Sequence, residues 1–135
     1  MYPGVHLLFK YLLGDPIIVN TCGKNNLVNN IVNEIKNRDK IFLQIAPSGT
    51  RIKTDMWKSG FYHIAFNADI HIVCSYIDSK TKTLGIAYPF KLTGDVTNDM
   101  DKIRSIYENK YGLNKDYTST IFIKEENMKQ KKINN

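Results

Sequence analysis

The chain has 135 residues, of which 42% are hydrophobic and 24% are charged, a composition typical of a globular protein with one domain of ordinary size. Its formal net charge of +6 suits an anionic membrane surface, a nucleic acid or a phosphorylated ligand, and does not select among them. No apolar run approaches the roughly 20 residues of a membrane-spanning helix, and neither cysteine lies in a CxxC pair or a zinc-ligand pattern. We therefore expect an intracellular protein, cytoplasmic or peripheral at a membrane surface, without a metal site.

The N-terminal third of the sequence predicts two helices around a short strand. Residues 1–13 are mostly apolar, and Gly14 is placed to end a short helix that would pack on the domain, which we favour, on a partner or on a membrane. Pro16–Asn20 reads as a short buried strand. The clearest helix covers Asn25–Asn37, since apolar side chains recur there on one face with a period of 3.6 residues: Leu27, Val28, Ile31, Val32 and Ile35.

The middle of the chain predicts three strands and a helix. Ile41–Ala46 is apolar with almost no polar alternation, which favours a central, parallel strand. A helix is expected over Trp57–Asn67 and a buried strand over Ile70–Ile77. After a polar turn, Leu84–Phe90 reads as a strand that forms a hairpin with the preceding one.

The C-terminal third predicts one more helix and a tail. The helix is expected over Asn98–Tyr111, with Gly112 placed to stop it. An α/β domain would thus cover residues 1–117, and residues 118–135 would form a charged, disordered tail. The order of elements favours an α/β sandwich with a mostly parallel sheet flanked by helices, in which sites form at loops that leave the carboxyl ends of strands.

A basic loop with a glycine follows the expected central strand. Thr50 offers a hydroxyl, and Gly49 lets the backbone approach a ligand closely. Arg51 carries a planar guanidinium that matches phosphate oxygens, and Lys53 and Lys58 add positive potential. A phosphate-sized anion is the ligand that this combination predicts, beside the alternative of a merely solvated basic loop.

Two other side chains near this loop invite a catalytic interpretation. Ser48 is disfavoured as a nucleophile, because no His or Asp has a sequence relation to it that indicates a triad. His63 lies on the expected helix near the loop, and hydrogen bonding that holds the loop is favoured over catalysis. No catalytic residue is therefore predicted within the chain.

Two stretches, Ala46–Arg51 and Trp57–Ala65, together resemble the glycerophospholipid (lysophospholipid, or 1-acylglycerol-3-phosphate) acyltransferase family, and its bacterial-type branch in particular. The resemblance covers roughly residues 6–112. Further matching stretches are Asn25–Val28, Tyr76–Asp78, Pro89–Lys91, Thr93–Asp95, Asp99–Met100 and Lys102–Arg104.

The resemblance implies an acyltransferase-type α/β sandwich and a reaction. An acyl group would pass from acyl-CoA or acyl carrier protein, which are substrates and not bound cofactors, to a hydroxyl of a glycerophosphate or lysophospholipid. A histidine of an H-x4-D motif would act as general base, oriented by the aspartate. Gly49, Thr50 and Arg51 would bind the acceptor phosphate, with accessory candidates Ser48, Lys53, Lys58 and His63.

The chain departs from this family at the positions that carry chemistry. Ser48 stands where the family has Glu, Asn20–Gly23 lacks the expected basic residue, and His71 replaces a usual Pro. By the spacing of the other motifs, the H-x4-D motif would lie upstream of Met1. None of the three histidines is followed five positions later by an aspartate; the pairs are His6 and Tyr11, His63 and Ala68, and His71 and Tyr76.

Three hypotheses follow. The first is an N-terminally truncated and degenerate acyltransferase-like protein, inactive as this chain stands, that retains affinity for a glycerophosphate or lysophospholipid and contacts a membrane peripherally. The second is the C-terminal part of a split or mis-started active acyltransferase, whose N-terminal half would be a separate partner. The third is a non-enzymatic basic module for phospholipid or nucleic acid; nucleic acid is disfavoured, since basic and aromatic residues do not interleave as in base-stacking surfaces.

Overall fold

The computed structural model describes residues 27–50 and 52–127, and the chain divides into two compact units, Met1–Ile45 and Ala46–Asn135. The domain expected over residues 1–117 thus spans both units. The helix and strand expected within residues 1–20 lie outside the described residues. In the described ranges, none of the helices has the length and apolar composition to cross a bilayer.

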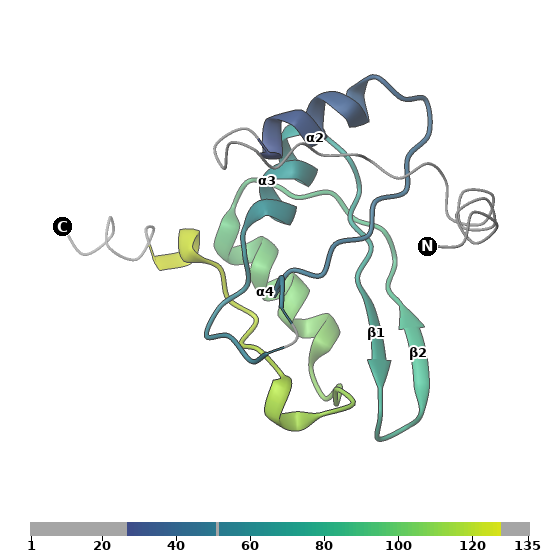
Figure 1. The fold of residues 1–135 in the computed structure, drawn as a ribbon, viewed down its shortest axis with the longest axis vertical. Coiled ribbons are helices and arrows are strands. Elements are labelled where there is room, and N and C mark those ends of the chain that lie inside the picture. Colours follow the sequence, from purple (N-terminus) through teal and green to yellow (C-terminus); the bar gives the residue numbers. More distant parts are fainter. Residues whose placement is uncertain (1–26, 51, 128–135) are drawn as a thin grey trace, which may run out of the picture. The chain divides into compact units, whose positions relative to one another are not determined.

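The first unit contains α2, Leu27–Lys36 (Figure 1). Its buried side chains, Ile31, Val32 and Ile35, are three of the five that the 3.6-residue period predicted, so the helix and its apolar face are confirmed. Arg38 pairs with Glu34 one turn earlier, at 3.3 Å on the exposed side, and such a pair adds little stability.

Ile41–Ala46 is not a strand, which corrects the prediction of a central, parallel one. None of its residues has β pairing, and the side chains of Phe42 and Ile45 are 78% and 39% exposed. A strand exists only with a neighbour that completes its backbone hydrogen bonds, and no described residues pair with this segment. The apolar composition of this segment predicted burial, but composition does not identify a neighbouring strand with which it could pair.

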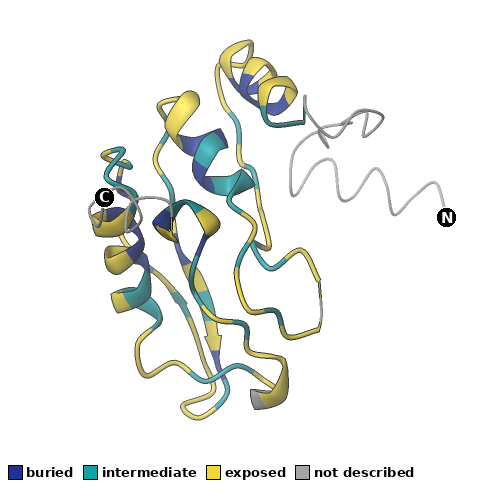
Figure 2. Ribbon diagram, turned by 90° about the vertical axis from the view of Figure 1, so that its left-hand side faces the viewer, coloured by how far each residue is buried: buried dark blue, intermediate teal, exposed yellow. Residues whose placement is uncertain are grey.

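The second unit is a mixed α/β arrangement (Figures 1 and 2). In chain order it contains α3 Gly60–Asn67, β1 Ser75–Asp78, β2 Thr83–Ile86, α4 Val96–Tyr107 and a 3₁₀ turn, η1, Lys115–Tyr117. Its only sheet in the described part of the chain is the pair β1–β2, which is antiparallel. The hairpin prediction is therefore confirmed, whereas a mostly parallel sheet is not found. Asp78 and Thr83 pair at the end of a short turn, and a parallel connection would need a dozen residues or more.

The core of this unit lies between α3, the hairpin and α4. Three side chains are at most 1% exposed: Met100, Ile103 and Ile123. Tyr62, Cys74 and Phe90 join them in one cluster, and Trp57 packs on its border. The Trp57 ring meets the Tyr107 ring edge-on at a centroid distance of 5.7 Å, which fixes the segment before α3 against the end of α4.

The two helices begin and end where backbone partners change. α3 begins at Gly60 and not at Trp57. The segment before it is held outside the helix, where the amides of Trp57 and Lys58 donate to the carbonyls of Phe122 and Pro47. α4 begins at Val96, capped by the Asp95 carboxylate, which accepts from the amides of Thr97 and Asn98. It ends at Tyr107 and not near Gly112, since Glu108 is extended and Asn109 adopts the left-handed conformation that asparagine tolerates.

A buried carboxylate ties α3 to the start of α4. Asp99 is 3% exposed, and its oxygens accept from the Tyr62 hydroxyl at 2.7 Å and from the Thr93 hydroxyl at 2.9 Å. The amides of Thr93 and Gly94 also donate to it, at 3.0 and 3.1 Å. Burial, together with the hydrogen bond and charge of Asp99, raises the pKa of Tyr62 far above its ordinary value, so the phenol stays a donor.

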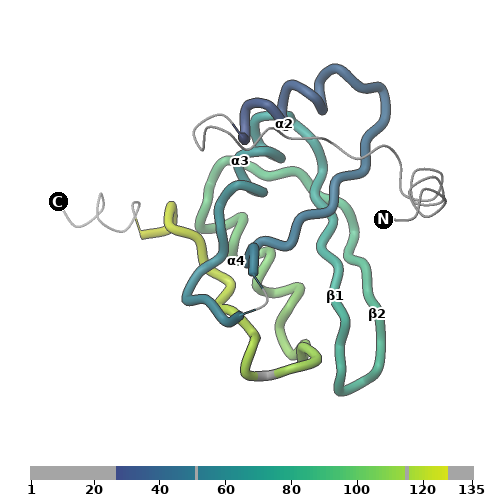
Figure 3. Tube along the Cα trace, viewed as in Figure 1, coloured from purple at the N-terminus to yellow at the C-terminus, as the bar shows by residue number. Residues whose placement is uncertain are grey.

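The first part of the expected tail belongs to the fold. Figure 3 shows the segment after η1 running beside the segment that precedes α3. The Thr120 amide donates to the Thr54 carbonyl at 3.3 Å, and the Trp57 amide to the Phe122 carbonyl at 2.7 Å. Ile123 is fully buried. Disorder therefore does not hold for residues 118–127, because an apolar triplet precedes the charged residues and supplies an anchor.

Candidate anion-binding site

The loop Ala46–Thr50 is closed by its own backbone. The Gly49 amide donates to the Ala46 carbonyl at 3.0 Å, and Gly49 has φ +64°, in the left-handed region that favours glycine. The Ser48 hydroxyl donates to the Thr50 carbonyl at 3.0 Å. The Ser48 side chain therefore helps to shape the turn.

Lys58 lies over this loop. Its amide donates to the Pro47 carbonyl at 2.9 Å, which joins the start of the WKSG stretch to the loop. Its side chain crosses Gly49 so closely that a Cβ at that position would lie 2.9 Å from Nζ and 3.0 Å from Cε. Lys58 is exposed, and no carboxylate in the described ranges pairs with it. The ammonium group thus lies at the loop, and no described carboxylate neutralises its positive charge.

The other candidates contribute unequally. The Thr50 hydroxyl accepts from the Ile52 amide at 3.2 Å, which leaves its own hydrogen for a ligand oxygen. Lys53 is exposed, and nothing in the described residues ties it to the loop. Arg51, the predicted phosphate fork, lies outside the described residues. The structure therefore brings Gly49, Thr50 and Lys58 together.

His63 has a different partner from the one expected. Its Nε2 lies 2.8 Å from Oε1 of Glu125, so the imidazole holds the C-terminal segment and not the loop. Burial alone would raise the pKa of Glu125, but hydrogen bonds from Ser59 and His63 outweigh it and hold that pKa below its ordinary value. Glu125 is therefore an anion at neutral pH, and it lies beside the imidazole of His63.

The groups that the structure describes at the loop suit an oxyanion. They comprise one ammonium group, one free hydroxyl hydrogen and a glycine whose lack of a side chain lets the Lys58 side chain cross the loop. The histidine nearest to the loop in the sequence, His63, contacts Glu125 through its Nε2 atom and has no hydrogen bond to the loop among the described residues. Within residues 27–50 and 52–127, no group of His, Cys, Asp and Glu side chains could hold a metal ion.

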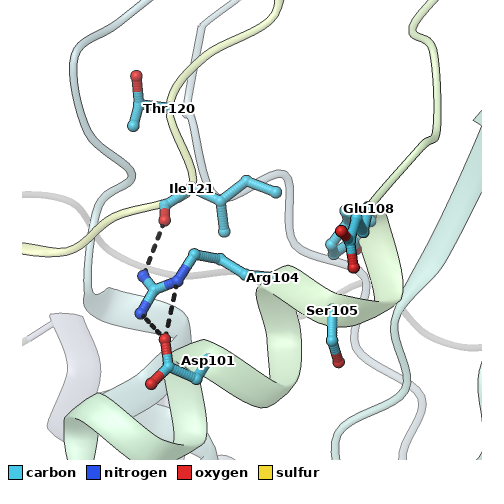
Figure 4. A pocket seen from close by; sticks show the side chains of 7 residues that line it. Asp101, Arg104, Ser105, Glu108, Thr120 and Ile121 are labelled. Atoms are coloured by element: carbon cyan, nitrogen blue, oxygen red, sulfur yellow. Dashed lines mark hydrogen bonds and ion pairs between the residues drawn. The ribbon is translucent and has the colours of Figure 1, made fainter.

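A separate open depression of about 490 Å³ lies between α4 and the C-terminal segment (Figure 4). Arg104 points into it, yet its guanidinium donates to Asp101 at 2.6 Å and to the Ile121 carbonyl at 3.1 Å. It also donates to the buried Glu126 at 2.8 Å. These acceptors engage most of the N–H groups of the guanidinium, and two of them are carboxylates that would repel an anion. The depression is therefore a poor anion site, and Arg104 joins the C-terminal segment to α4.

The sequence did not reveal Glu125 and Glu126 as partners of His63 and Arg104. Their positions inside a charged stretch suggested a solvated tail. The available signal was the apolar triplet Ile121–Ile123 immediately before them, which has the length of a short anchoring segment.

Replacing Gly49 by alanine is expected to lower the free energy of unfolding by about 1–2 kcal/mol. The left-handed φ disfavours any Cβ, and the new methyl group would also displace the Lys58 side chain. Urea unfolding measures the change. Gly60→Ala is the matched control: nothing lies within 4 Å of its Cβ position, so α3 should gain up to about 1 kcal/mol. Equal effects of the two substitutions would contradict the loop geometry.

Searches against protein-family models, curated proteins and solved structures return no match for this chain.

Proposed function

We propose that the loop Ala46–Thr50 and Lys58 bind the phosphate of a glycerophosphate or lysophospholipid, and that the chain is an acyltransferase-like protein without transferase activity of its own. The observation that carries the proposal is the position of the Lys58 side chain across Gly49. Two stretches that resemble the family separately in the sequence thus meet in space. A left-handed glycine with an ammonium group beside it, followed in the chain by a hydroxyl, offers the groups that bind a phosphate.

The absence of an H-x4-D motif from the 135 residues supports binding without turnover. Acyl transfer to a hydroxyl needs a base that removes its proton while the thioester is attacked, and such a base typically contributes about 10² to 10⁴ in rate. The histidine nearest to the loop in the sequence is His63, and its side-chain hydrogen bond is with Glu125 of the C-terminal segment and not with the loop. Incubated with acyl-CoA and lysophosphatidic acid, the chain is therefore expected to release no thiol above the rate without protein.

A second candidate is the C-terminal part of an active acyltransferase, completed by another polypeptide that carries the H-x4-D motif. The observation that favours it is Ile41–Ala46, an apolar segment without a strand partner among the described residues. In an acyltransferase-type α/β sandwich this segment would lie in the sheet. Coexpression with an H-x4-D polypeptide encoded in the adjacent DNA would separate the candidates, because a stable complex with turnover supports the second and no association supports the first.

Replacing Lys58 by glutamine is expected to weaken binding of glycerol 3-phosphate at least about tenfold, since a charge-assisted hydrogen bond to phosphate is lost. Isothermal titration calorimetry on the full chain provides the affinities. Lys124→Gln is the matched control: Lys124 is also exposed, and its substitution removes one positive charge outside the loop. Inorganic phosphate and lysophosphatidic acid, titrated in parallel, distinguish a free phosphate site from a lipid headgroup site. Equal affinities of the two variants would contradict the proposal.

A further inference from the structure

The β1–β2 hairpin exposes an apolar face. Residues opposite each other in an antiparallel pair point to the same side, and the register pairs Ser75 with Ile86 and Ile77 with Leu84. The side chains of Ile77, Leu84 and Ile86 are 56%, 74% and 73% exposed. Val73 and Tyr88, at 46% and 94%, continue the pattern beyond the strand ends. We call these five residues the hairpin face.

The opposite side of the hairpin is already packed, so the hairpin face cannot turn inward. The Tyr76 ring covers Gly85 so closely that no Cβ would fit there. Cys74 is buried in the core cluster, and the Tyr107 hydroxyl of α4 donates to the Ser75 carbonyl at 3.2 Å. One side of the hairpin therefore packs toward α4, and the other side is exposed.

The charged side chains around the hairpin face indicate which kind of partner would bind there. Lys80 and Lys82 lie at the exposed tip, and the carboxylate of Asp78 beside them is turned inward, accepting from the Thr81 hydroxyl and the amides of Lys80 and Tyr111. A second copy of the chain would bring two molecules of net charge +6 together. An anionic surface gains from the same charges, and apolar side chains flanked by lysines and an aromatic ring are typical of interfacial lipid binding.

We propose that the hairpin face docks on an anionic lipid surface, with its apolar side chains among the acyl chains and with Lys80 and Lys82 at the headgroups. The contact rests on the hairpin alone and does not depend on the phosphate loop. It would keep the protein at the surface where lysophospholipids reside, whichever ligand the loop takes.

Cosedimentation of the full chain with vesicles tests the proposal. Vesicles of phosphatidylcholine with phosphatidylglycerol are expected to retain the protein, and those of phosphatidylcholine alone to retain it much less. The double variant Leu84→Asn/Ile86→Asn should lower retention at least about tenfold. Ile52→Asn/Leu113→Asn is the matched control, since those side chains are 71% and 79% exposed elsewhere. Lys82→Gln should lower retention about fivefold on the anionic vesicles.

Three results would overturn the proposal: no preference of the chain for anionic vesicles, equal retention of the two double variants, or a lipid-free dimer that Leu84→Asn/Ile86→Asn converts to a monomer. The last result, seen by sedimentation velocity, would assign the hairpin face to a second copy. Leu84→Asn/Ile86→Asn should leave binding of glycerol 3-phosphate at the loop unchanged while lowering vesicle retention, so failure of the hairpin proposal and failure of the loop proposal are distinguishable.

Discussion

Replacing Asp99 by asparagine is expected to lower the free energy of unfolding by about 2–4 kcal/mol. The carboxylate accepts from two hydroxyls and two amides in a site that is 3% exposed. An asparagine side chain has one accepting oxygen and a donating NH₂ group, so at least one buried donor would face another donor. Urea unfolding followed by circular dichroism provides the measurement.

Asp101→Asn serves as the control for this substitution. Asp101 lies on the same helix, but its side chain is 63% exposed, and its pair with Arg104 is an exposed one worth at most about 1 kcal/mol. The double variant with Tyr62→Phe should show coupling between Tyr62 and Asp99, because their side chains share one hydrogen bond. Similar losses for Asp99→Asn and Asp101→Asn would contradict the buried network.

Replacing Ile123 by alanine is expected to cost about 2–5 kcal/mol, the usual range for emptying a fully buried isoleucine site. The side chain sits among Met100 and Ile103 of α4, so the cavity would open in the centre of the core cluster. Leu113→Ala is the control: Leu113 is 79% exposed and should change stability by less than about 0.5 kcal/mol. Chemical denaturation of both variants is the measurement.

This pair of variants also decides whether residues 118–127 belong to the fold. If they formed a disordered tail, Ile123→Ala would resemble Leu113→Ala. The structure predicts the opposite, because the Arg104–Glu126 pair and the Trp57–Phe122 backbone bond hold the segment along its length.

Local periodicity predicted α2, the hairpin and α4 well, since each depends on residues close in sequence. The buried side chains of α2 recur at helical spacing, and Asp95 caps α4 by contacts within three residues. Predictions that depended on distant partners were less successful. Ile41–Ala46 has the composition of a buried strand but lacks a neighbouring strand in the described part of the chain. Residues 118–127 look like a solvated tail until Trp57 and Arg104 supply their partners.

The candidate site shows the same division. The glycine-containing loop after Ala46 was predictable from Pro47 and Gly49, which are typical turn residues, and Gly49 has φ +64°. The position of the Lys58 side chain across that glycine was not predictable from spacing, because the two residues are nine positions apart in the sequence and do not share a helix or strand. His63 was placed on the correct helix, but its partner Glu125 is 62 positions away in the sequence.

The central claim is that a phosphate binds at the loop Ala46–Thr50 beside Lys58, and amide chemical shifts of the isotopically labelled chain test it most directly. On addition of glycerol 3-phosphate, we predict the largest shifts at the amides of Gly49, Thr50 and Lys58, present in Lys124→Gln and lost in Lys58→Gln. Shifts centred on the depression beside Arg104, or shifts unchanged by Lys58→Gln, would contradict the claim.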